Sequence, residues 1–323
     1  MKFLRIMGKI LAGLLLLLVL ASLIALYVYR DIPREVLEAK YTNEASQFTE
    51  VAGVRIHYRD EGPRDAPAVV LIHANFASLL GWEPWAEALK DKYRVVRLDM
   101  TSHGLTGPDP TGDYTLERTM EITEAFIDAL GIEKLTIGGT SLGGTVSVFY
   151  TMRNPERVNN LILLSPGSVE GKEQQARRGK VPDSAYILKY ILPRALPEFM
   201  LAPGFGGDEQ PPEELITRWH DMWLLEGQRE AQLDRLSQYD SGDIGAVFAQ
   251  VRIPVLLLWG EDNTTAKYEQ HEEVIHMLKN AESINFVSYP GVGHMATQQA
   301  GAEIAVDVRA FLDGTLNEAT LVQ

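Results

Sequence analysis

The stretch LTIGGTSLGG, residues 135–144, joins an apolar run to a glycine-rich turn and then to a helical pattern. Residues 139–143 have the spacing G-x-S-x-G, with Ser141 at the centre. A serine between a strand and a helix lies on a sharp, strained turn, where neighbouring glycines avoid Cβ clashes and expose its Oγ. The N–H group after such a serine faces a developing oxyanion. The stretch therefore favours Ser141 as a nucleophile over an ordinary serine in a glycine-rich turn.

Short apolar, β-branched runs alternate with longer amphipathic stretches along most of the chain. The runs predicted as strands are residues 54–59, 69–73, 93–99, 135–139, 160–165, 255–260 and 284–289. The stretches predicted as helices are residues 82–89, 116–130, 144–153, 268–280 and 302–312. This alternation is typical of an α/β fold with helices around a mostly parallel sheet. It breaks at residues 168–245, where a helical, aromatic and proline-interrupted sequence indicates an inserted segment.

A serine nucleophile needs a base and an orienting acid, which must come from later strand ends if the sheet is doubly wound. His294 lies in the glycine-flanked loop YPGVGHM, directly after the last predicted strand. Glu261 and Asp262 follow the strand before it, in LLLWGED. The chain order is therefore Ser, Asp, His, which is the order of α/β-hydrolases.

At these residues the sequence resembles the α/β-hydrolase superfamily, and in particular its membrane-anchored, cap-bearing serine esterase-like members. The resemblance covers about 270 residues, from roughly Gln47 to Leu316. The matching segments are VVLIHANFAS, YRVVRLDMTSHGLTGPDPTGDYTLE, GGTSLGG, PERVNNLILLSP, IPVLLLWGED, PGVGHM and DVRAFL. The resemblance implies a mostly parallel eight-stranded sheet with helices on both faces and a helical cap. It also implies a serine carboxylester hydrolase that acts on small to medium apolar esters through a Ser-His-Asp triad and an acyl-enzyme intermediate.

The resemblance also implies an oxyanion hole. Its donors would be the N–H groups of Asn75, in the run His73-Ala74-Asn75-Phe76, and of Leu142. Ala74 stands where the family usually has glycine, so a positive φ there would strain the loop. His73 is expected to hydrogen-bond loop backbone rather than to take part in catalysis. Asp99 and His103 in DMTSHG are expected to organise the neighbouring loop in the same way.

The acid of the triad is where the sequence departs from the family. The usual acid position, three residues after the strand-end glycine, is occupied by Asn263, which has no carboxylate to stabilise an imidazolium. We assign the acid to Asp262, one residue earlier. Glu170, after the strand at residues 160–165, is the main alternative, and Glu261 is expected to point away from His294.

The insert is expected to cover the carboxyl ends of the strands and to set substrate preference. Trp219 and Trp223 are separated by one helical turn, so at least one is expected to reach the pocket. Phe76, beside the expected oxyanion hole, is a third candidate for substrate contact. The glycine- and proline-rich stretch at residues 202–212 predicts a mobile loop that gates entry.

The N-terminus predicts a membrane segment. Residues 10–29 contain no charge and, as a helix rising about 1.5 Å per residue, would reach roughly 30 Å, enough to span a bilayer core. A cleaved signal peptide is the alternative, because three basic residues precede the run. We expect a retained anchor with a cytoplasmic N-terminus, since moving this cationic tail across the membrane is costly. The body of the protein would then be extracytoplasmic, in the periplasm if the protein is bacterial.

Composition excludes several function classes. The chain has no cysteine, so disulfides, a thiolate nucleophile and Cys-ligated metal sites are ruled out. The formal net charge is −14, and a body this acidic repels phosphate backbones, which disfavours nucleic acid as a partner. His271 and His276 lie five residues apart with no carboxylate cluster beside them, so neither a metal nor an organic cofactor is implied.

These features divide the chain into an anchor at residues 1–30, a linker at 31–46, a core at 47–167 and 246–323, and a helical cap at 168–245. The expected partners are a small-molecule ester and, through the first helix, a membrane. Lipases, lactonases, C–C bond hydrolases and acyltransferases use the same triad and stay open as alternatives. A tethered binding protein that has lost turnover is a further alternative, motivated by Ala74 and Asn263.

Overall fold

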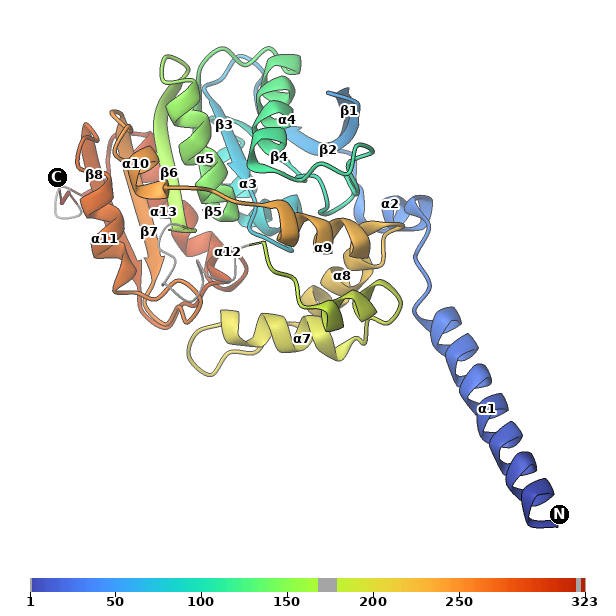
Figure 1. Cartoon of the computed structure of the whole chain (residues 1–323). Helices are drawn as coiled ribbons and strands as arrows, with labels where there is room; N and C mark the ends of the chain where they lie inside the picture. Colours follow the sequence, from blue (N-terminus) through green and yellow to red (C-terminus); the bar gives the residue numbers. More distant parts are fainter. Residues whose placement is uncertain (1, 168–178, 318–320, 323) are drawn as a thin grey trace.

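The computed structural model describes residues 2–167, 179–317 and 321–322 (Figure 1). Its centre is an eight-stranded sheet with the order β1-β2-β4-β3-β5-β6-β7-β8. The strands are β1 (Ser46–Val51), β2 (Val54–Glu61), β3 (Ala68–Ile72), β4 (Arg94–Leu98), β5 (Leu135–Ser141), β6 (Val158–Pro166), β7 (Pro254–Gly260) and β8 (Ser283–Tyr289). The pairs β1–β2 and β2–β4 are antiparallel, and all others are parallel. The predicted mostly parallel eight-stranded sheet is confirmed.

The seven predicted strands all form, and the sequence pattern missed one, β1. Its sequence SQFTEV contains no apolar run, and only its last residue, Val51, is buried. It pairs with β2 through a two-residue turn at Ala52 and Gly53, both with positive φ. An edge strand needs no continuous apolar sequence because few of its side chains are buried.

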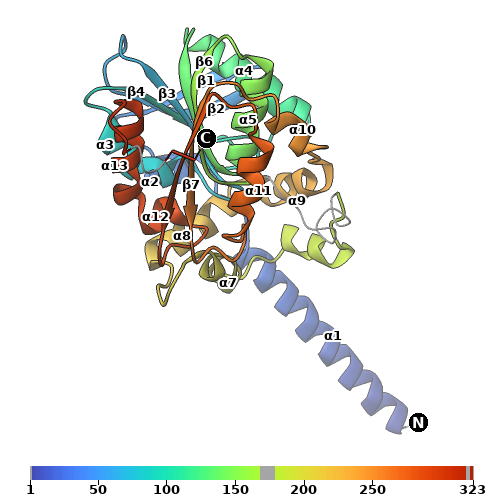
Figure 2. The same cartoon turned by 90° about the vertical axis from the view of Figure 1, so that its left-hand side faces the viewer.

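Helices cover both faces of the sheet, as Figures 1 and 2 show together. On one face lie α4 (Leu116–Ala129), α5 (Leu142–Arg153), α10 (Ile244–Phe248) and α11 (Gln270–Met277), and on the other α3 (Glu83–Leu89) and α13 (Gly301–Leu312). Alternate residues of the central strands feed the two cores, so Val70 packs on the α5 side and Leu71 on the α3 side. All five side chains of β3 are buried, as expected for a parallel strand covered on both faces.

The predicted insert forms a helical cap below the sheet in Figure 1. It comprises the 3-10 helix η2 (Asp183–Lys189), α7 (Ala195–Leu201), η3 (Ala202–Gly204), α8 (Glu213–Trp223) and α9 (Gln228–Gln238). Two further short elements, the 3-10 helix η1 (Leu79–Trp82) and α12 (Ala296–Gln299), contact each other. The cap lies at the carboxyl ends of the parallel strands, where open α/β sheets bind ligands.

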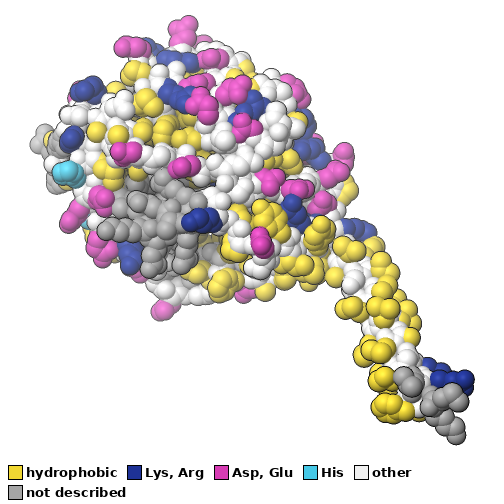
Figure 3. Space-filling view, viewed as in Figure 1, with side chains coloured by type: hydrophobic (Ala, Val, Ile, Leu, Met, Phe, Trp, Pro, Cys, Tyr) yellow, Lys and Arg dark blue, Asp and Glu magenta, His cyan; other side chains and the backbone are white. Residues whose placement is uncertain are grey.

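The first helix, α1 (Lys2–Val28), extends away from the body, and Figure 3 shows hydrophobic side chains along its length. The segment Arg5–Val28 is long and apolar enough to cross a membrane, and none of its most apolar window is buried in the protein. It is therefore a candidate membrane span.

The stretch expected to be a linker contains a second helix, α2 (Arg34–Tyr41). Leu37 of this helix is buried at 1% exposure in a cluster with Leu105 and Leu225. The Lys40 ammonium lies 2.6 Å from the Asp221 carboxylate of α8. Residues 31–46 are thus packed against both core and cap, although the boundaries we drew at 30 and 46 stay predictions.

Candidate active site

Ser141 is the last residue of β5 and directly precedes α5. Its backbone has φ 50° and ψ −118°, a conformation that costs a residue with a side chain about 1–3 kcal/mol. The turn is closely packed, since a Cβ added to Gly143 would lie 2.0 Å from the carbonyl oxygen of Ile72. Only glycine fits there, which explains the G-x-S-x-G spacing. The turn lifts Ser141 above the carboxyl end of the sheet.

A cavity of about 490 Å³ lies between this turn and the cap. Ser141 and His294 both line it, together with Asn75 and Leu142. Leu142 is the first residue of α5, and the first N–H groups of a helix have no acceptor within that helix. The structure therefore brings the predicted nucleophile, base and oxyanion-hole residues to one cavity.

Asn263 is the side-chain partner of His294. Its Nδ2 lies 3.1 Å from Nδ1 of His294. Its Oδ1 accepts hydrogen bonds from the backbone N–H groups of Thr265 and Ala266, at 3.0 and 2.9 Å. These two donors fix the orientation of the amide, so that its NH₂ group faces the imidazole. Because an amide NH₂ only donates, Nδ1 of His294 accepts, and the ring proton lies on Nε2.

The structure places Asn263, and not the predicted acid Asp262, beside His294. The Asp262 carboxylate accepts a hydrogen bond from the backbone N–H of Gly207 at 3.0 Å. Its own N–H donates to the carbonyl oxygen of Val292, which turns the chain so that the next residue faces His294. Asp262 thereby fastens the predicted gating loop to the body. Glu170, the alternative acid, lies outside the described residues.

His294 is held as neutral imidazole. Burial lowers its pKa to about 4, and no carboxylate of the described residues opposes that effect. A carboxylate at the position of Asn263 would favour the imidazolium that forms when serine is deprotonated. The cavity thus has a serine and a neutral histidine in its wall, with an amide beside the imidazole.

Comparison with known proteins places this site in a family. A family model described as alpha/beta hydrolase fold matches residues 67–297. The chain belongs to the alpha/beta hydrolase family. It is 26% identical over 271 residues to the bifunctional esterase/perhydrolase of Acinetobacter calcoaceticus, covering 80% of this chain and 96% of the relative. It is 28% identical to 3-oxoadipate enol-lactonase 2 of Acinetobacter baylyi, over 69% of this chain and 83% of that one.

The fold also matches solved structures. A bacterial membrane phospholipase A aligns with a TM-score of 0.72 and 23% identity, over 95% of this chain and 99% of its own. At that identity the likeness shows the fold of this alpha/beta hydrolase and not its substrate.

Two polar residues singled out in the sequence, His73 and Asp99, organise the loops beside this cavity. His73 Nε2 accepts from the N–H of Met100 at 3.0 Å, and its Nδ1 lies 2.7 Å from the Ala74 carbonyl oxygen. Asp99 accepts from the N–H groups of Leu79 and Leu105 at 2.7 and 2.9 Å. These contacts confirm the expected role of His73 and Asp99 in holding loop backbone.

The expected strain at Ala74 does not occur. The backbone of Ala74 does not have a positive φ, whereas Phe76, two positions later, has φ 62°. The left-handed turn of the loop therefore falls on Phe76, and alanine replaces glycine at position 74 without a conformational penalty.

The three aromatic candidates lie around two adjoining cavities of the hydrolase. Phe76 and Trp219 line the cavity that contains Ser141. Phe76 and Trp223 line a second cavity of about 290 Å³ within the cap, and their ring centroids are 4.9 Å apart. Both tryptophans are less than 10% exposed, so they also contribute to the packing of the cap.

Sequence reasoning missed Arg235 of α9, which lines the cavity with Ser141. One of its terminal nitrogens donates to Oδ1 of Asn75. The signal in the sequence is a run of polar residues at helical spacing, Gln228, Gln232 and Arg235, all of which are buried. A polar stripe on the inner face of a cap helix indicates a polar function for that face.

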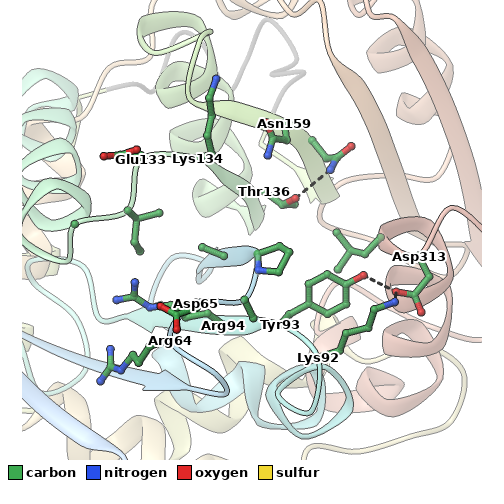
Figure 4. A pocket seen from close by; sticks show the side chains of 17 residues that line it. Arg64, Asp65, Lys92, Tyr93, Arg94, Glu133, Lys134, Thr136, Asn159 and Asp313 are labelled. Carbon is green, nitrogen blue, oxygen red and sulfur yellow. Dashed lines mark hydrogen bonds and ion pairs between the residues drawn. The ribbon is translucent and has the colours of Figure 1, made fainter.

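A separate cavity lies at the opposite end of the sheet. It has a volume of about 650 Å³, and Figure 4 shows the charged side chains that line it. Its lining includes the first residues of β3, β4 and the start of β6, so it opens at the amino ends of the parallel strands. It contains neither Ser141 nor His294.

Proposed function

We propose that the protein is a serine carboxylester hydrolase with Ser141 as nucleophile and His294 as proton carrier. The observation that carries the proposal is the strained turn at Ser141, which lines one cavity with His294, Asn75 and Leu142. Strain of this kind persists at functional sites, where the surrounding packing enforces it.

In the first half of the reaction, Ser141 Oγ attacks the ester carbonyl and its proton passes to His294. The N–H groups of Asn75 and Leu142 stabilise the oxyanion. The C–O bond then breaks, the alkoxide takes the proton from His294, and the acyl group stays on Ser141. In the second half, water attacks the acyl carbon and gives its proton to His294. The carboxylic acid product then leaves, and Ser141 regains its proton from His294.

Asn263 shapes how this chemistry runs. To accept a proton from serine, the imidazole nitrogen facing Ser141 must carry none. Because the amide NH₂ of Asn263 donates to Nδ1, the ring proton occupies Nε2, the nitrogen that has to accept the serine proton. Reaching the reactive tautomer means losing that hydrogen bond, so the proposed hydrolase works as a serine–histidine dyad with slow turnover.

The cap supports a substrate with an apolar part. The second cavity is lined mostly by apolar side chains, and Phe76 joins it to the cavity that holds Ser141. We assign Phe76, Trp219 and Trp223 to contacts with the acyl or alcohol part. The names of the two curated relatives, an esterase/perhydrolase and an enol-lactonase, support ester chemistry. Lipase, lactonase, C–C bond hydrolase and acyltransferase activities use the same residues and remain alternatives.

The second candidate is a tethered binding protein without turnover, which the Asn263–His294 contact favours. In either case the proposed location is a single-pass membrane protein with a cytoplasmic N-terminus and an extracytoplasmic body, in the periplasm if bacterial. The apolar helix α1 supports this arrangement.

The test is covalent labelling of the full-length protein in detergent with a fluorophosphonate, followed by an ester panel. The proposal expects labelling at Ser141, loss of labelling in Ser141→Ala, and hydrolysis that falls at least about 10³-fold in Ser141→Ala or His294→Ala. The double variant should lose little more, because residues that act as a unit are not additive. A folded wild-type protein that neither labels nor hydrolyses any ester would favour the binding protein.

A further inference from the structure

Arg235 is a buried cation in the wall of the proposed active site. Its side chain is 5% exposed, and it lines the cavity that contains Ser141. One terminal nitrogen donates to Oδ1 of Asn75 and lies 3.4 Å from Oε1 of Gln232. Its Nε is buried without a hydrogen-bond partner. Within residues 2–167, 179–317 and 321–322, no carboxylate forms an ion pair with it.

The other buried arginines are paired. Arg97 contacts the carboxylates of Glu61 and Glu83, Arg59 contacts Glu83, and Arg229 lies 2.6 Å from the carboxylate of Asp31. These pairs follow the rule that a buried charge needs an opposite charge close by. Arg235 is the exception among the buried arginines that the structure describes.

The surroundings of Arg235 supply dipoles and an aromatic ring instead of a negative charge. The guanidinium carbon lies 5.7 Å from the ring centre of Phe76. His103, whose Nε2 is 3.3 Å from the same Asn75 oxygen, is kept neutral because burial and Arg235 both lower its pKa. Burial lowers the pKa of Arg235 itself to about 10, which still leaves it charged at neutral pH.

We propose that Arg235 binds a carboxylate carried by the substrate, so that the ester is a half-ester of a short dicarboxylic acid or a similar anionic ester. This rests on the proposed function and narrows its substrate class. A guanidinium binds a carboxylate through paired N–H donors, and a desolvated site strengthens that contact. Because Arg235 contacts the side chain of Asn75, whose N–H is assigned to the oxyanion, the carboxylate lies within a few bonds of the ester carbonyl.

The competing explanation is that Arg235 only braces the Asn75 loop. The two roles differ in what they do to substrates of different charge. A brace affects neutral and anionic esters alike, whereas a carboxylate-binding residue affects the anionic ester through KM and spares the neutral one.

The experiment compares monomethyl succinate with the neutral methyl pentanoate, in full-length protein in detergent, by titration of released acid. We expect kcat/KM of the wild type to favour the anionic ester by at least about 10-fold. Arg235→Gln should lower kcat/KM for monomethyl succinate by about 10- to 100-fold, mainly through KM. For methyl pentanoate the change should stay within about 3-fold. Arg235→Lys should recover part of the loss, since it keeps the charge but not the paired donors.

The matched control is Arg194→Gln, which removes an arginine of the cap that pairs with Glu213 and lines neither cavity of the site. This variant should leave kcat/KM for both esters unchanged. Equal losses on both esters in Arg235→Gln would establish the brace and overturn the proposal, as would a wild type without preference for the anionic ester.

A binding measurement separates this inference from the proposed function. Titration calorimetry of Ser141→Ala with succinate and with the neutral succinamide requires no turnover. The carboxylate site is supported if Ser141→Ala binds succinate but not succinamide, and if the double variant Ser141→Ala/Arg235→Gln no longer binds succinate. This result does not depend on the hydrolysis of any ester. Fluorophosphonate labelling and hydrolysis of methyl pentanoate without any binding of succinate would leave the hydrolase standing and overturn the carboxylate site.

Discussion

Charged side chains are paired at one end of the parallel sheet, whereas two cationic or titratable side chains at the other end have no carboxylate partner among the described residues. At the amino end, around the cavity of Figure 4, Lys92 lies 2.6 Å from the carboxylate of Asp313, and Arg94 lies 2.8 Å from that of Asp60. At the carboxyl end, Arg235 and His294 have no carboxylate partner in the part of the chain that the structure describes. The charged groups described at the amino end are paired with one another, whereas Arg235 and His294 at the carboxyl end are free to bind a charged group of a ligand.

This difference has a physical basis. A paired charge gains stability from its partner and has little left to offer a ligand. An unpaired buried group costs stability, and such groups persist where the surrounding structure over-determines them, usually at functional sites. Changes at the carboxyl end should consequently alter activity, and changes at the amino end should alter stability.

The largest effect is expected from giving His294 the carboxylate it lacks. In Asn263→Asp one oxygen keeps the N–H groups of Thr265 and Ala266, and the other accepts from Nδ1–H of His294. The reactive tautomer then becomes the favoured one, so kcat should rise by about 10³-fold, somewhat below the cost of the reverse change in a serine protease.

Steady-state kinetics on a neutral ester measure this gain, and Asp262→Asn provides the matched control. Because the Asp262 carboxylate binds the N–H of Gly207 and not His294, this control should leave kcat within a few-fold of the wild type. If Asp262→Asn instead abolishes turnover and Asn263→Asp does nothing, Asp262 is the acid after all.

Most of the fold could be predicted from the sequence, and the third member of the site could not. Apolar runs marked the buried parallel strands, while the polar edge strand β1 gave no such signal. Ser141 and His294 each follow a predicted strand, so topology brings them to one edge of the sheet. Which of Asp262 and Asn263 faces His294 depends on how the loop backbone turns. That turn is fixed by the hydrogen bond between Asp262 and Val292, a contact across 30 positions that no local pattern encodes.

At the amino end, the buried pair of Arg94 and Asp60 should govern stability alone. The Asp60 carboxylate is completely buried, and Arg94 contacts it through Nε and Nη2. Arg94→Gln leaves the carboxylate with Arg64, which is half exposed, so the free energy of unfolding should fall by about 2–3 kcal/mol. Denaturant unfolding measures the loss, and kcat/KM should stay within 2-fold. A parallel fall in kcat/KM at temperatures where the variant is folded would break the division between the two ends.

The third effect is a pH dependence that originates at the carboxyl end. The pKa of His294 is about 4 in the folded protein, below the ordinary value of 6.5. As pH falls from about 6.5 to 4, the unfolded chain binds a proton that the folded protein does not. The contribution of His294 to the free energy of unfolding is therefore fully present above pH 6.5 and is lost as the pH falls to about 4. The expected loss is about 1–3 kcal/mol. His294→Gln should reduce the slope of stability against pH in this interval.

The same group sets the acid limb of activity. Because His294 stays neutral down to about pH 4, kcat/KM of the wild type should fall only near that pH. In Asn263→Asp the new carboxylate favours the imidazolium, so the limb should move to higher pH. A wild-type limb near pH 6.5 that is unchanged in Asn263→Asp would mean that His294 is solvated and that Asn263 does not control it.

The smallest effect should come from the exposed pair at the amino end. The Lys92 side chain is 52% exposed, so solvent screens its attraction to Asp313, which Tyr93 also contacts. Lys92→Gln should therefore change the free energy of unfolding by less than about 1 kcal/mol and leave kcat/KM unchanged. The measurement is denaturant unfolding at low and high salt, beside Arg94→Gln. A loss for Lys92→Gln as large as that for Arg94→Gln would mean that burial does not set the strength of these pairs. The contrast with the unpaired carboxyl end would then need another cause.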